Sequence, residues 1–270
     1  MSADLQMAAA AADAAGKIIR NGYSQLHKME AKGVGDFVSD IDRQADQAAQ
    51  QILSTDPKNT PVLSEEISPI LGPGETNFWI VDPLDGTSAF LFRTGRTYSS
   101  VLVAKRQNNK TDLGVIFFPM TEEWFYAERG QGAFRNEESL VIHEPGELKT
   151  GWVELNQYGD SAFESDFFGT LRNRLRTQNG AALVTQSAPY SGVAMRIAES
   201  NNSLVAAIHD NNPESVKQAA WDIAAPQCVL SEAGGLFINR DGNPIDPFQP
   251  EPFIVARSQK IADQILQLMH

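Results

Sequence analysis

The stretch Phe78-Trp79-Ile80-Val81-Asp82-Pro83-Leu84-Asp85-Gly86-Thr87-Ser88-Ala89-Phe90 decides how the chain is organised. Its apolar start, Phe78 to Val81, predicts a short buried strand that ends in two carboxylates, Asp82 and Asp85. Like charges held close together must be protonated, separated or neutralised by cations, and carboxylate oxygens are the ligands that Mg²⁺ prefers. The stretch therefore predicts a magnesium site where the strand ends.

The residues around the two acids suit a tight turn beside an anion site. Pro83 fixes φ, and Gly86 allows a positive φ or a close backbone approach. Thr87 offers a hydroxyl at the predicted start of a helix, where phosphate also binds well. We therefore expect the turn to aim the two acids and to hold an anion next to them.

Composition and charge restrict the class of protein. The 270 residues are 42% hydrophobic and 21% charged, which is typical of a soluble globular chain. The net charge of −12 argues against a nucleic-acid polymer as partner, because such polymers bind basic surfaces. Cys228 is the one cysteine, so an intrachain disulfide is excluded. Residues 1–22 lack a signal-peptide core and no run reaches membrane-spanning length, so we expect a cytoplasmic protein without a membrane partner.

Upstream of the opening stretch, the pattern predicts two helices and a strand. Apolar residues at helical spacing predict a helix from about Ala3 to Asn21, with Gly22 as its C-terminal stop. A hairpin or loop follows, and then a helix for which Ser39 or Asp40 is the expected N-cap. Asp42 then has a plain interpretation as a first-turn acid facing the helix dipole.

A short strand from Thr60 to Ser64 ends in Glu65-Glu66, which alone is typical of a solvated loop pair. Downstream of the opening stretch the chain first favours antiparallel strands and then alternating strands and helices. The antiparallel strands are expected over 97–105, 113–118 and 123–127. The later strands are expected over 152–155, 181–185, 204–208 and 253–256, and the helices over 160–176, 191–199, 221–232 and 259–268. Cys228 lies in the apolar helix 221–232 and is expected in the core.

Five acids lie where a predicted element begins or ends, each beside a short apolar run. They are Asp42, Glu65, Asp82, Asp85 and Asp222. Asp222 alone has a plain interpretation as an N-cap or first-turn acid. Ends of several elements can meet at one edge of a sheet, and carboxylates gathered there would form a multi-metal site. Two metals can clamp an in-line displacement at phosphorus, so the repetition of these acids indicates phosphoryl chemistry.

In several segments, taken in order, the chain resembles the inositol monophosphatase family. Asp82-Pro83-Leu84-Asp85-Gly86-Thr87 resembles the first signature of that family, and Trp221-Asp222-Ile223-Ala224-Ala225 resembles the second. The other matching segments are Val38-Ser39-Asp40-Ile41-Asp42, Ser64-Glu65-Glu66, Gly130-Gln131-Gly132-Ala133-Phe134 and Glu232-Ala233-Gly234-Gly235. The resemblance covers about residues 5–268.

This resemblance implies an α+β protein with a layered αβαβα sandwich and magnesium-dependent phosphomonoester hydrolysis. We expect a single catalytic domain, 1–270. Its subregion 1–145 would hold an antiparallel sheet with the metal and phosphate site. Its subregion 146–270 would hold an α/β part with the substrate loop and the last metal ligand. Homodimers are common in this family, so a homodimer is expected.

The resemblance also implies a ligand set for two Mg²⁺ ions, with three as an alternative count. Glu65, Asp82 and the backbone carbonyl of Leu84 would hold the first ion. Asp82, Asp85 and Asp222 would hold the second. Glu65 would also help to hold the third through water.

Other positions take catalytic and substrate roles from the resemblance. Asp42 and Thr87 match the pair that positions and activates water, and Glu65 assists as the third catalytic residue. The backbone amides of Gly86 and Thr87 would hold the phosphate beside a helix N-terminus. Ser191, Gly192 and Val193 correspond to the substrate loop, which also includes Ala194.

The substrate expected first is a small polyol or sugar phosphate of the inositol 1-phosphate type. The chain departs from the family in the link over 209–220, where Asp210 and Glu214 are both candidates for a carboxylate that contacts sugar hydroxyls. The Ser-Glu-Glu and Asp-Pro-Leu-Asp-Gly-Thr forms also occur in 3′(2′),5′-bisphosphate nucleotidases, which act on adenosine 3′,5′-bisphosphate. A catalytically inactive regulator that binds metal or phosphate is the alternative of another class, and it would be recognised by loss of ligands.

Overall fold

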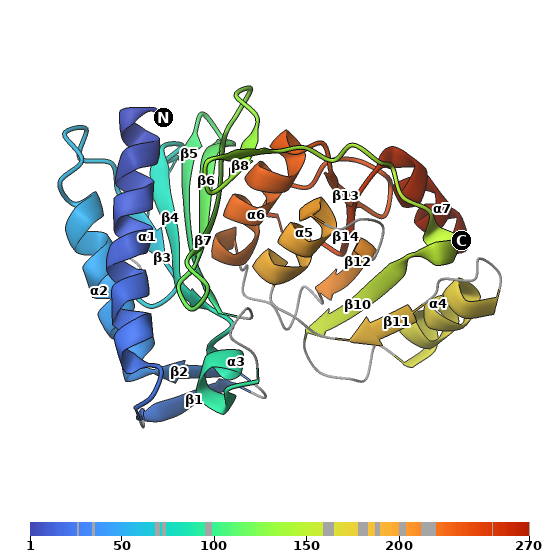
Figure 1. Cartoon of the computed structure of the whole chain (residues 1–270), viewed down its shortest axis with the longest axis horizontal. Coiled ribbons are helices and arrows are strands. Elements are labelled where there is room, and N and C mark those ends of the chain that lie inside the picture. The colour runs from blue at the N-terminus through green and yellow to red at the C-terminus, as the bar shows by residue number, and fades with distance from the viewer. Residues whose placement is uncertain are drawn as a thin grey trace. The chain divides into compact units, whose positions relative to one another are not determined.

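The computed structural model describes residues 1–25, 27–33, 36–67, 71, 74–94, 99–158, 165–177, 183–186, 190–199, 204–211, 220–249 and 251–269. Figure 1 labels the helices and strands of this structure. The chain divides into two compact units. Unit 1 comprises Met1–Ser139, Pro189–Gly192 and Ala220–Glu232, and unit 2 comprises Leu140–Ala188, Val193–Ala219 and Ala233–His270.

Unit 1 contains a seven-stranded sheet with the order β3-β4-β5-β6-β7-β8-β9. Strand β3 is parallel to β4, and each neighbouring pair from β4 to β8 is antiparallel. The bounds are β3 Val62–Ser64, β4 Phe78–Asp85, β5 Ser100–Gln107, β6 Lys110–Phe118, β7 Glu123–Glu128, β8 Ala133–Arg135 and β9 Glu138–Leu140. The predicted antiparallel strands are therefore confirmed, and the strand of the opening stretch lies second from one edge.

Helices cover both faces of this sheet (Figure 1). Helices α1 (Ala3–Gly22) and α2 (Asp40–Leu53) pack on one face, and α6 (Ala220–Glu232) packs on the other. A hairpin of β1 (Met29–Gly33) and β2 (Asp36–Ser39) precedes α2, as the sequence allowed. The short helix α3 (Thr87–Phe92) follows β4 directly.

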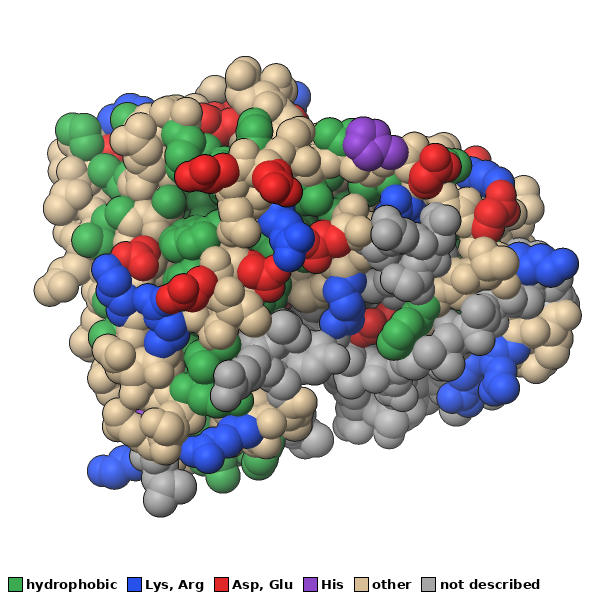
Figure 2. Space-filling model, in the orientation of Figure 1, with side chains coloured by type: hydrophobic (Ala, Val, Ile, Leu, Met, Phe, Trp, Pro, Cys, Tyr) green, Lys and Arg blue, Asp and Glu red, His purple; other side chains and the backbone are tan. Residues whose placement is uncertain are grey.

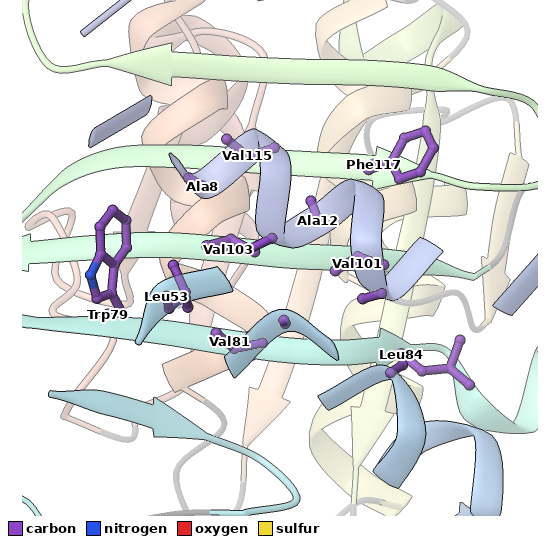
Figure 3. Close-up of a cluster of buried hydrophobic side chains, with 14 of the residues drawn as sticks. Ala8, Ala12, Leu53, Trp79, Val81, Leu84, Val101, Val103, Val115 and Phe117 are labelled. Atoms are coloured by element: carbon purple, nitrogen blue, oxygen red, sulfur yellow. The ribbon is translucent and has the colours of Figure 1, made fainter. Parts of the chain in front are cut away.

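Alternate residues of the strands form the core beneath α1 and α2, because side chains along a strand point to opposite faces. Figure 3 shows Trp79 and Val81 of β4 in one cluster with alanines of α1 and Leu53 of α2. The small residues of α1 allow a close approach to the sheet. A Cβ added at Gly16 would lie 2.3 Å from a ring carbon of Phe117, which is too close for any side chain at that position.

Unit 2 contains a five-stranded mixed sheet with the order β11-β10-β12-β14-β13. Strand β10 is parallel to β11 and β12, whereas β14 is antiparallel to β12 and β13. The strands are β10 Trp152–Tyr158, β11 Leu183–Gln186, β12 Leu204–Asn211, β13 Leu236–Asn239 and β14 Phe253–Ala256. Helices α4 (Ser165–Thr177) and α7 (Gln259–Met269) share a core with this sheet. A 3₁₀ turn, Leu148–Thr150, comes before β10, and α5 spans Tyr190–Glu199.

Three expectations about local structure were wrong or incomplete. Gly22 is the last residue of α1 and Tyr23 is the C-cap, so the helix ends one residue later than expected. A Cβ at Gly22 would come within 2.6 Å of Ile41, so the glycine also allows close packing. Strand β4 does not end at Val81 but continues to Asp85 across a bulge, because Asp85 still pairs with Ser100. Strands β8, β9 and β13 were not predicted. The predicted segments 97–98, 160–164 and 181–182 lie outside the described residues.

Two broader observations concern the surface and the helices. On the face shown in Figure 2, Lys and Arg side chains are interspersed with Asp and Glu. Across the part of the chain that the structure describes, no helix combines the length and the apolar character that a membrane crossing requires. The expectations of a cytoplasmic location, of no nucleic-acid partner and of one catalytic domain with the two stated subregions stay predictions.

Candidate functional site

Three of the five predicted acids meet in unit 1. Asp82, Asp85 and Asp222 each offer one carboxylate oxygen, and these oxygens all lie within 4.8 Å of one another. Strand β4 supplies the first two acids, and the first turn of α6 supplies the third. Asp222 therefore reaches the other two from a segment more than 130 positions later in the chain, a convergence that the acid pattern allowed.

Asp82 is buried and has three other carboxylates close to it. It is 1% exposed, and the Leu84 backbone N–H donates to its Oδ1 over 2.9 Å. Within the described residues its Oδ2 is buried and accepts no hydrogen bond. Burial raises the pKa of Asp82 well above its ordinary value, and the nearby carboxylates of Glu65, Asp222 and Asp85 raise it further. A divalent cation would remove both effects, so the donor set fits Mg²⁺.

Glu65 lies next to this cluster because of the pairing between β3 and β4. Ser64 is opposite Val81 in the parallel register, and the Glu65 backbone N–H donates to the Val81 carbonyl over 3.1 Å. Asp46 of α2 holds the same segment, since the Ser64 hydroxyl donates to its Oδ1 over 2.7 Å. Glu65 is therefore half-buried beside Asp82. This position differs from the solvated loop pair that the local sequence alone favours.

Asp42 and Thr87 form a hydrogen-bonded pair. The Thr87 hydroxyl lies 2.7 Å from Asp42 Oδ1 and 3.1 Å from the Leu84 carbonyl, so its single proton serves the nearer carboxylate. Asp42 Oδ2 accepts from both the backbone N–H and the hydroxyl of Ser39, in a capping box at the start of α2. Asp42 therefore does two things at once: one oxygen caps the start of α2, and the other accepts the hydrogen bond from Thr87.

Burial raises the pKa of Asp42, and the hydrogen bonds from Ser39 and Thr87 oppose that shift. The carboxylate is fully buried and is fixed on both of its oxygens. A rigid, buried carboxylate of raised pKa is a suitable proton acceptor.

Two serine hydroxyls near Asp85 were not singled out for this role by the sequence. Ser100 donates to Asp85 Oδ2 over 3.2 Å, and the Ser191 hydroxyl donates to the same oxygen. Burial raises the pKa of Asp85 to about 6, and these hydrogen bonds oppose the shift. Ser100 could be found only through the pairing of β4 with β5, because the signal is its position opposite Asp85 and not a motif.

The predicted phosphate and substrate contacts lie at two helix starts. Gly86 has φ of 85° and is the N-cap of α3, and Thr87 is its first residue. The positive φ expected of Gly86 is thereby confirmed. Ser191, Gly192 and Val193 are all buried in α5, and their contact with substrate stays a prediction.

The two candidates for a carboxylate that contacts sugar hydroxyls, Asp210 and Glu214, stay predictions. Glu214 lies outside the described residues, and only the backbone of Asp210 is described, within β12.

The buried position expected of Cys228 is confirmed.

Comparisons with known proteins agree with this arrangement. A sequence model of the inositol monophosphatase family matches residues 1–270. An inositol-1-monophosphatase of Rhizobium meliloti is 31% identical over 235 residues, with 84% of this chain and 82% of the relative covered. The solved structure of extragenic suppressor protein suhB from Bartonella henselae superposes with a TM-score of 0.83 at 24% identity, covering 99% of this chain and 98% of that one.

A second solved structure is that of an IMPase/NADP phosphatase complexed with Mg²⁺ and phosphate. It superposes with a TM-score of 0.75 at 23% identity and covers 93% of this chain and 90% of that one. The solved structures confirm the predicted α+β fold.

Proposed function

Because the chain belongs to the inositol monophosphatase family and is a phosphomonoesterase, we propose that it hydrolyses a small polyol or sugar phosphate of the inositol 1-phosphate type. The observation that carries this proposal is the cluster of Asp82, Asp85 and Asp222 beside the Thr87–Asp42 hydrogen bond. The cluster is suited to cations, and the hydrogen-bonded pair is suited to water. A hydrolase in which metal ions help to activate water uses both.

The residues that we propose for Mg²⁺ are those that the family resemblance implies, and three of them, Asp82, Asp85 and Asp222, bring carboxylate oxygens together. Glu65, Asp82 and the Leu84 carbonyl would hold one ion, and Asp82, Asp85 and Asp222 a second, with three ions as the alternative count. Leu84 fits this role because the Thr87 proton serves Asp42, which leaves the Leu84 carbonyl as an acceptor. Magnesium, when bound, supplies positive charge that offsets the phosphate and makes water more acidic.

The protein's own groups would then guide the attack. Thr87 donates its hydroxyl proton to Asp42, so its oxygen can accept a proton from an adjacent water molecule. As Thr87 takes that proton it would pass its own hydroxyl proton to Asp42, which its capping hydrogen bonds keep in place. Glu65, beside Asp82, would help to orient water. The backbone amides of Gly86 and Thr87 would bind phosphate oxygens at the start of α3.

The test is phosphate release from a panel of monoesters by pure protein with Mg²⁺. The panel is inositol 1-phosphate, adenosine 3′,5′-bisphosphate, fructose 1,6-bisphosphate, histidinol phosphate and NADP, compared by kcat/KM. We expect inositol 1-phosphate or a related polyol phosphate to be the best substrate. Asp222→Asn should abolish release, whereas Asp241→Asn, the same exchange in an exposed turn, should not.

Other results would change the proposal in defined ways. Preference for adenosine 3′,5′-bisphosphate or NADP would favour a nucleotidase, a candidate supported by the fold shared with the IMPase/NADP phosphatase. Binding of Mg²⁺ without release from any monoester would favour the inactive regulator. We also propose a homodimer, which sedimentation of the pure protein would test.

A further inference from the structure

Three oxygen atoms, Oδ2 of Asp85 and the hydroxyl oxygens of Ser100 and Ser191, form a triangle. The hydroxyls of Ser100 and Ser191 lie 2.8 Å apart, and each is within hydrogen-bond distance of Asp85 Oδ2. Ser100 is the first residue of β5 and is paired with Asp85 across the sheet. Ser191 comes from the first turn of α5. Both serines are buried, with exposed fractions of 0% and 1%.

The hydrogen count shows how this triangle acts on the carboxylate. Each serine has one hydroxyl proton, and Asp85 in its ionised form has none. Either both serines donate to Oδ2, or one donates to the other, which then donates to Oδ2. In both cases Oδ2 accepts at least one hydrogen bond from a serine hydroxyl. The backbone N–H of Ser191 also bonds to this carboxylate, so its orientation is fixed from two segments of the chain.

A carboxylate with one oxygen engaged in this way has only the other oxygen as a strong metal ligand. Mg²⁺ binds in near-octahedral geometry at about 2.0–2.1 Å and takes carboxylates through one oxygen, whereas Ca²⁺ at about 2.3–2.6 Å also accepts both oxygens of one carboxylate. The geometry of Asp85 therefore matches the smaller cation.

We propose that Ser100 and Ser191 hold Asp85 as a one-oxygen ligand and thereby make the metal site select Mg²⁺ against Ca²⁺. This inference rests on the proposed function, because it takes Asp85 as a metal ligand. It adds that the two serines are positioning residues and that selectivity comes from their hydroxyls. Without the hydroxyls, the carboxylate keeps only the hydrogen bond from the Ser191 backbone N–H, so it can turn more easily and bind the larger ion through both oxygens.

The test measures metal binding and not turnover. Mg²⁺ and Ca²⁺ are titrated separately into the phosphate-free protein by isothermal titration calorimetry. The variants are Ser100→Ala, Ser191→Ala and the double variant, and near-ultraviolet circular dichroism checks their folding. Ser191→Thr retains a hydroxyl at one corner of the triangle. Ser54→Ala is the matched control, since that serine is exposed after α2 and donates only to the Gln51 carbonyl.

Loss of outer hydrogen bonds to a metal ligand weakens metal binding by about 10–100-fold. We therefore expect the Kd for Mg²⁺ to rise about tenfold in the double variant, while the Kd for Ca²⁺ stays equal or falls. Ser191→Thr and Ser54→Ala should keep the selectivity of the unmodified protein.

Two results would overturn the inference. Unchanged Kd values for both ions in the folded double variant would show that the hydroxyls do not act on the metal site. An equal fold-loss of affinity for both ions would show that they only support the site and do not set selectivity. If the unmodified protein bound neither ion, the proposed function would fail as well, which distinguishes the two failures.

Discussion

Gly114→Ala should separate helix α6 from the sheet and disturb the metal cluster from a distance. Gly114 lies on β6, and a Cβ at this position would lie 2.8 Å from the Ala225 carbonyl oxygen and 2.9 Å from the Ala225 Cα. Both atoms belong to the backbone of α6, so no side chain can rotate away. Asp222 lies one helical turn earlier in the same helix and must move with it.

The size of the effect follows from these distances. Ordinary contacts of a Cβ begin at 3.4 Å, so α6 must retreat by about 0.6 Å or the strand must bend by as much. Overpacking of this kind costs about 1–3 kcal/mol of stability. Functional sites tolerate displacements of about 0.5 Å, so we also expect Mg²⁺ affinity to fall.

Urea unfolding and calorimetric titration with Mg²⁺ measure the two effects. Gly169→Ala, in α4 of unit 2, is the matched control, because a Cβ at that position meets nothing within 4 Å. In a helix interior this exchange should stabilise by about 0.5–1 kcal/mol and leave Mg²⁺ binding unchanged. Stability and Mg²⁺ affinity of Gly114→Ala equal to those of the unmodified protein would refute the reasoning, because α6 would then not depend on the close approach.

Three further predictions address catalysis, pH and the core. Thr87→Val removes the proton donor to Asp42 and should lower kcat about 10²-fold in steady-state assays while calorimetry shows unchanged Mg²⁺ affinity. Burial raises the pKa of Asp85 to about 6, so the folded metal-free protein holds this proton more tightly than the unfolded chain. That stabilisation is present below about pH 4 and is lost as the pH rises through 6. The urea concentration at the unfolding midpoint of the metal-free protein should therefore fall over this pH range, and added Mg²⁺ should remove the fall. Lys105 is 1% exposed with Nζ 3.7 Å from Asp56, so Lys105→Met should cost about 3 kcal/mol in urea unfolding by leaving a buried carboxylate without its cation.

Much of the fold could be predicted because its elements follow simple periods. The spacing of alanines and isoleucines in α1 and the β-formers of β5 to β7 are local patterns that packing did not override. The end of β4 was misjudged for a physical reason. Pro83 and two acids normally terminate a strand, but here a bulge accommodates them and Asp85 still pairs with Ser100.

The residues of the candidate site also fall into two groups, those that a local pattern indicates and those that it does not. Asp82 and Asp85 could be proposed as cation ligands from the sequence, because an apolar strand that ends in two acids favours a cation close by. Glu65 and Asp42 could not be distinguished from a surface acid and a helix cap by their own neighbours, and only the ordered set of segments indicated more. Ser100 was missed, because a serine at the start of a strand has no local signature of function.

The sequence by itself indicated the phosphatase family of the protein, because the motifs and their order along the chain are read directly from it. It also determined most helices and strands, whose periods are read within a few residues. Only the tertiary structure decided which oxygens meet. Asp222 approaches Asp82 because Gly114 lets α6 lie close against β6, and both serines share one oxygen of Asp85 because of strand register and helix placement. Such contacts depend on the packing of distant segments, which no local pattern contains.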